Sequence, residues 1–96
     1  MVEFHILQGT GSGAWNSLAS PLQVKVGDTL RIYNDDSTGV GKQIHAGGKP
    51  FNHASTAIPL AGFKDYLIAQ AADPAIDRVY NHLVGNTARF YIRAVP

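Results

Sequence analysis

Short runs of alternating apolar and polar residues, each closed by a turn signal, constrain the fold of this chain more than any other feature. In residues 2–7, Val2, Phe4 and Ile6 fall on one face of an extended chain, which is the period of a half-buried strand. The same alternation predicts strands at residues 21–26, 29–34 and 87–93. Because no segment combines the length and the period of a capped helix, we expect an all-β fold.

Weaker patterns occupy the rest of the chain. Residues 43–46, 56–60 and 63–68 predict further short strands, and residues 71–77 predict a loop with room for one helical turn. Glycine-rich and polar segments predict long loops at residues 9–13 and around the short strand within residues 35–54. Many short strands separated by turn signals are typical of a β-sandwich or barrel. The length of 96 residues predicts a single domain over residues 1–96.

Composition argues against several classes of protein. The formal net charge is +1 and no basic stripe is present, so nucleic acid is not an expected partner. No apolar run approaches the ~20 residues needed to span a membrane. The chain has no cysteine, which rules out disulfides and thiolate ligands. Its first residues already alternate as a strand, so we expect no signal peptide within them.

Histidine is the residue type that points most directly to chemistry. His45 and His53 bracket a glycine-rich stretch, and His82 precedes the last predicted strand. Imidazoles on two loops of one β-scaffold could converge on a metal ion, and without a thiolate they suit Cu(II) or Zn(II). The Irving–Williams order favours copper over zinc at equal geometry. Each histidine also has an ordinary explanation, as a surface side chain or a partner of a carbonyl, and His5 is expected to be exposed on its strand.

An oxygen ligand could complete such a site. Asn81, Asp35 and Asp36 are the candidates that the sequence offers. Adjacent residues at a strand end point apart, so Asp35 and Asp36 fit a turn better than a paired acid site.

Two segments of the chain resemble the cupredoxin family. Residues 22–36 contain Val-Gly-Asp-Thr between two alternating runs, and residues 79–92 run from Val-Tyr-Asn-His into the last predicted strand. The resemblance implies a Greek-key β-sandwich, copper as the cofactor, His45 and His82 as ligands, and a periplasmic or extracellular location after export. The family's cysteine and methionine are absent, with Asn81 and Asn86 near their places. The resemblance therefore does not extend to a blue-copper centre, which needs a thiolate.

Other local patterns have better structural explanations. Residues 9–14 formally match a dinucleotide fingerprint, but a new strand follows too soon for a crossover helix. No serine lies in a nucleophile elbow, so we expect no catalytic residues. Trp15 and Phe51 flank glycine-rich loops, where they either fill the core or form an exposed apolar patch at the histidine end; the core is preferred for Trp15.

The leading hypothesis is a metal-binding protein, with His45, His82 and then His53 as ligands for copper. It would act as a carrier or an electron-transfer module, together with a redox or metallochaperone partner. A second hypothesis is a cupredoxin-like module that binds no metal and has a binding or structural role. A third is a small copper redox enzyme with an open three-histidine site, for which the sequence identifies no substrate.

Overall fold

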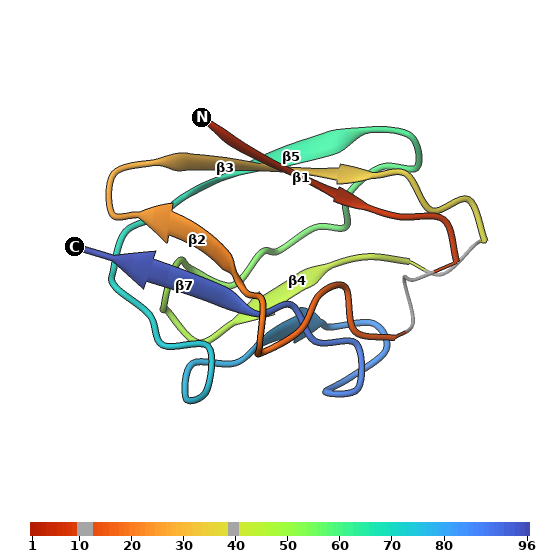
Figure 1. The fold of residues 1–96 in the computed structure, drawn as a ribbon. Helices are drawn as coiled ribbons and strands as arrows, with labels where there is room; N and C mark the ends of the chain where they lie inside the picture. The colour runs from red at the N-terminus through yellow and green to blue at the C-terminus, as the bar shows by residue number, and fades with distance from the viewer. Residues whose placement is uncertain (10–12, 39–40) are drawn as a thin grey trace.

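Seven short strands form the regular structure of the computed structural model, which describes residues 1–9, 13–38 and 41–96 (Figure 1). In chain order they are β1 (Val2–Ile6), β2 (Leu22–Lys25), β3 (Thr29–Asn34), β4 (Ile44–Ala46), β5 (Phe63–Leu67), β6 (Val79–Asn81) and β7 (Ile92–Val95). Within these ranges the chain forms no helix, so the expected all-β class is confirmed. The predicted loops at residues 9–13 and 35–54 lie partly outside the described residues, at 10–12 and 39–40.

The strands pair in three groups that form two layers. β1 runs parallel to β3, and β3 pairs antiparallel with β5, which gives one three-stranded sheet. β2 runs parallel to β7, and β4 pairs antiparallel with β6. Figure 1 shows the three-stranded sheet on one side of the molecule and the two smaller pairs on the other. The result is sandwich-like, as the many short strands predicted.

Apolar side chains between the layers form the core. Along β3, Leu30 and Ile32 are fully buried, whereas Arg31 and Tyr33 point to the other face and are half-buried. Every strand contributes to the buried cluster, through Ile6, Val24, Leu30, Ile44, Tyr66, Val79 and Ile92 among others. Since burying a large aliphatic side chain is worth about 1.5–3 kcal/mol, this cluster holds the two layers together.

Both aromatic residues that flank the glycine-rich loops belong to the interior. Trp15 is 9% exposed and its ring lies 5.6 Å from that of Phe90. Phe51 is 2% exposed and stacks on Tyr66 at 5.0 Å. The core role expected for Trp15 is confirmed, and neither side chain is available to form an exposed apolar patch.

The last predicted strand is divided between two neighbours. Residues 88–90 bond to β6, because Asn81 N–H donates to Ala88 O at 2.9 Å and Phe90 N–H donates to Val79 O at 2.8 Å. From Ile92 onward the chain pairs with β2 instead. The prediction of one continuous strand over residues 87–93 was therefore wrong in its bounds, since alternation reports an extended chain but not its partner.

Residues 56–60 form no strand, contrary to the prediction. Ile58 is the only buried residue of that segment, and Pro59 has no N–H to give to a ladder. Residues 63–68 do contain the expected strand, as β5, and residues 43–46 contain β4. The chain described by the structure has no helix with the length and apolar character to cross a bilayer.

Candidate metal centre

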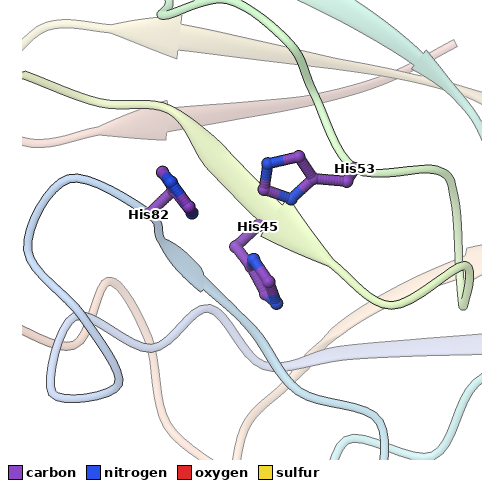
Figure 2. Close-up of side chains that lie close together, drawn as sticks. All are labelled: His45, His53 and His82. Carbon is purple, nitrogen blue, oxygen red and sulfur yellow. The ribbon is translucent and has the colours of Figure 1, made fainter.

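Three histidines lie together beside the β4–β6 pair (Figure 2). Their ring centroids are 4.7 Å apart for His45 and His53, 5.0 Å for His53 and His82, and 5.7 Å for His45 and His82. Each residue offers one ring nitrogen, and these nitrogens all lie within 4.8 Å of one another. The structure thus brings together all three candidate ligands that the sequence suggested.

The register of β4 against β6 decides the face on which His45 lies. His45 pairs with Tyr80 and shares its face of the ladder, while the adjacent residues Ile44 and Asn81 point into the interior. The His45 ring stacks on the Tyr80 ring, with centroids 4.3 Å apart and planes inclined by 21°. The Tyr80 ring therefore fixes the orientation of the His45 ring.

Hydrogen bonds to β4 hold the loop that carries His53. The Ala54 N–H donates to Ile44 O at 3.1 Å, and the Gln43 Nε2 donates to Ala54 O at 2.9 Å. The residue next to His53 is thus tied to the strand that carries His45. These contacts bring His53, a loop residue, into the cluster.

His82 is placed by its own backbone and by Asn81. The His82 N–H donates to Gln43 O at 2.6 Å, directly beside β4. Asn81 is fully buried; its Oδ1 accepts from Gln43 N–H at 3.1 Å and from Leu83 N–H at 3.2 Å, and its Nδ2 donates to Gly41 O at 2.7 Å. The amide therefore joins the segments that carry His45 and His82, on the side of the ladder away from the imidazoles.

The electrostatics of the cluster favour a neutral His45. Burial lowers the pKa of His45 below its ordinary value of 6.5, and the nearby His53 and His82 lower it further. Its Nδ1 is buried and accepts or donates no hydrogen bond. A neutral imidazole with an unused nitrogen is the form that binds a metal ion, so these observations fit a metal ligand.

One ion would need the three nitrogens closer together than they lie in the structure. Ligands about 2.0–2.1 Å from a tetrahedral ion lie about 3.3 Å from one another, whereas these nitrogens are separated by as much as 4.8 Å. His53 and His82 are exposed, so rotation of their side chains can bring the nitrogens closer without disturbing the core. The residues present therefore fit a three-histidine site with at least one open position.

The oxygen ligands considered from the sequence lie elsewhere. Asn81 points into the interior, and Asp36 is buried with Lys42. Asp35 instead pairs with His5, whose Nδ1 lies 2.5 Å from its carboxylate, and the His5 side chain is 48% exposed. In the described part of the chain no carboxylate joins the histidine cluster. His5 is thus the exposed strand residue expected.

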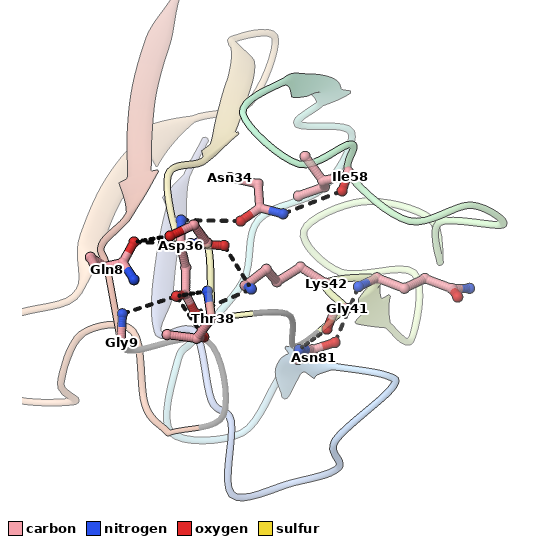
Figure 3. Close-up of polar contacts among 11 residues, drawn as sticks. Gln8, Gly9, Asn34, Asp36, Thr38, Gly41, Lys42, Ile58 and Asn81 are labelled. Atoms are coloured by element: carbon pink, nitrogen blue, oxygen red, sulfur yellow. Dashed lines mark hydrogen bonds and ion pairs between the residues drawn. The ribbon is translucent and has the colours of Figure 1, made fainter.

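A buried ion pair lies in the segment that leads to β4 (Figure 3). The Lys42 Nζ and the Asp36 Oδ2 are 3.1 Å apart, and both side chains are 0% exposed. The Asp36 Oδ1 also accepts from the Thr38 hydroxyl at 2.7 Å and from the Gly9 N–H at 3.0 Å. These hydrogen bonds, together with the one from Lys42, hold the pKa of Asp36 well below its usual range. The turn role expected of Asp36 is present, through its bonds to Thr38.

Sequence reasoning missed the residues that position the site. Lysine is almost never fully buried unless paired, so nothing marked Lys42 as an interior residue. Gln43 and Asn81 act through hydrogen bonds to distant backbone groups, for which the sequence holds no signal. Neighbouring side chains of a strand point to opposite faces. A prediction of β6 as a strand would therefore have placed Tyr80 on the face opposite Asn81, which is the face of the histidines.

Comparison with protein-family models, with curated proteins and with solved structures finds no match to this chain. Function must therefore be inferred from the site itself.

Replacing Asn81 by alanine tests its role in joining the two segments. The variant leaves the Gln43 N–H and the Gly41 carbonyl without their partner, so we expect a loss of about 1–3 kcal/mol in the free energy of unfolding. Urea denaturation measures it, with Asn52→Ala as the exposed control. A variant as stable as the parent would contradict the role.

Replacing Lys42 by methionine tests the buried ion pair. The change leaves a buried carboxylate without its cation, and we expect the free energy of unfolding to fall by about 3–5 kcal/mol. Lys25→Met, at an exposed position of β2, should lie within about 0.5 kcal/mol of the parent. A loss below about 1 kcal/mol for Lys42→Met would show that the pair contributes little.

The pH dependence of stability should report Asp36. Because its pKa is lowered in the folded state, its contribution is complete above the unfolded-state value of about 3.9 and is lost as the pH falls toward the folded-state value. The stability difference between the parent and Asp36→Asn should therefore shrink between about pH 5 and pH 2. Thermal melts across that range measure it, and a constant difference would count against the assignment.

Proposed function

We propose that this protein binds one copper ion through His45, His53 and His82 and acts as a cupredoxin-like copper carrier or redox module. The observation that carries the proposal is the convergence of three imidazole nitrogens within 4.8 Å, one of them the ligand atom of a partly buried His45. Nitrogen ligands without thiolate or thioether suit Cu(II) better than Cu(I). The Irving–Williams order favours copper over zinc at a site with these ligands.

The resemblance to cupredoxins supports the same proposal. It assigns ligands to the segments around His45 and His82, and β4 and β6 lie side by side, so these segments meet as the resemblance requires. We propose on this basis a Greek-key sandwich of the cupredoxin type, working in the periplasm or outside the cell. Without a cysteine the copper would lack the strong copper–thiolate bond, so weak colour is expected.

Exposure of the site supports a carrier. His53 and His82 are exposed, whereas His45 is partly buried and stacked on Tyr80. A bound ion would be held on its inner side by His45. It would be accessible from solvent on the side of His53 and His82. A redox or metallochaperone partner could therefore approach the ion directly.

Copper titration of the purified protein and its alanine variants tests the proposal. We expect one Cu(II) per chain, nitrogen couplings from imidazoles in the paramagnetic resonance spectrum, and an affinity loss greater than about 100-fold for His45→Ala, because removing a ligand should exceed the 10–100-fold cost of disturbing an outer partner. His53→Ala and His82→Ala should each remove one coupled nitrogen.

The matched control is His5→Ala, which removes an imidazole that pairs with Asp35 outside the cluster. It should bind copper as the parent does. Saturating copper should also raise the melting temperature of the parent, by linkage. If the protein takes up no copper, or if His45→Ala and His5→Ala bind copper with equal affinity, the proposal is wrong. The hypothesis of a metal-free module would then be the better one.

A further inference from the structure

A pocket adjoins the histidine cluster and shares a wall with it. His45 and Tyr80 line the pocket, which has a volume of about 540 Å³. Small-molecule sites in proteins usually measure about 300–1,000 Å³. A molecule in this pocket would therefore lie against His45, the least exposed of the three histidines of the proposed copper site.

The charges around the pocket favour an anion. Lys49 and Arg78 line it, both are exposed, and neither forms an ion pair within the described residues. The carboxylate on the lining, Asp77, is engaged by the neighbouring turn, because its Oδ2 accepts from the Asp73 N–H at 2.9 Å. Two cations thus face the pocket against one acid that is already hydrogen-bonded.

The register explains why both cations reach the same place. Ala46 pairs with Val79 at the end of the β4–β6 ladder, so Gly47 continues one chain and Arg78 the other. Lys49 follows on the first chain after Gly48, whose φ of +101° favours glycine. Lys49 and Arg78 therefore lie at one end of the β4–β6 ladder. His45 lies on the outer face of the same ladder.

A divalent ion on the histidines would make this region more positive. A bound Cu(II) would add two positive charges near Lys49 and Arg78. Like charges repel one another. An anion that ligates the open position of the ion would offset this repulsion. Three protein ligands and one open position is the arrangement in which metal sites accept an outside molecule.

We propose that the pocket binds a small organic carboxylate, whose carboxylate group ligates the copper at its open position and is attracted by Lys49 and Arg78, while its body fills the pocket. This proposal rests on the proposed copper site and adds the class of its outside ligand. The pocket volume exceeds what an inorganic ion fills, and the exposed side chain of Ile76 and the ring of Tyr80 offer apolar contact. The amide side chains of Gln70 and Asn86 also line the pocket.

The test titrates the copper-loaded protein with sodium acetate and with sodium benzoate. The absorption and paramagnetic resonance of Cu(II) should change saturably with either, and benzoate should bind more tightly because its ring occupies the pocket. Lys49→Gln and Arg78→Gln should each weaken benzoate binding about fivefold, the effect of one unit charge at a distance of about 4 Å in water. Neither variant should lower the affinity for copper.

Lys25→Gln and Arg93→Gln are the matched controls, since they remove the same charges from exposed positions of β2 and β7. They should bind benzoate as the parent does. Copper uptake with no spectral response to carboxylates, or with equal benzoate affinity in all four variants, would overturn this inference and leave the copper site intact. Failure to take up copper at all would overturn the proposed function and this inference with it.

Discussion

The pairing of β4 with β6 in a single register is the constraint on which the whole site depends. It places His45 opposite Tyr80 on the outer face and buries Ile44, Ala46, Val79 and Asn81 on the inner face. A slip of one residue would turn His45 into the core and expose Ile44, because the side-chain period of a strand is two. Burial of the aliphatic side chains therefore holds the imidazole outward.

Polar groups inside the protein then tie the neighbouring segments to this pair. Asn81 bonds backbone groups just before β4 and just after β6, and Gln43 holds the loop of His53. Lys42, one residue earlier, is buried against Asp36 and connects the start of β4 to the end of β3. Because buried polar groups without partners are costly, each of these bonds favours one arrangement of the loops over its alternatives.

Prediction from the sequence succeeded where the signal was local. The alternation in β1, β2 and β3 is visible in a few consecutive residues, and the structure has those strands within a residue or two of the predicted bounds. The segment at residues 87–93 was predicted as one strand, yet its first half bonds to β6 and its second half to β2. Which neighbour an extended chain meets depends on the whole fold, so no window of residues could reveal the division.

The sequence by itself determined an all-β chain without a thiolate and with histidine as its candidate metal ligand, because composition and alternation are properties of the residues themselves. Only the tertiary structure decided that His53 joins His45 and His82, that Asn81 and Asp36 turn inward, and that Lys49 and Arg78 meet at one pocket. Most of these contacts join segments far apart in the chain. They follow from the register and burial of paired strands, for which the sequence provides the residues but not the partners.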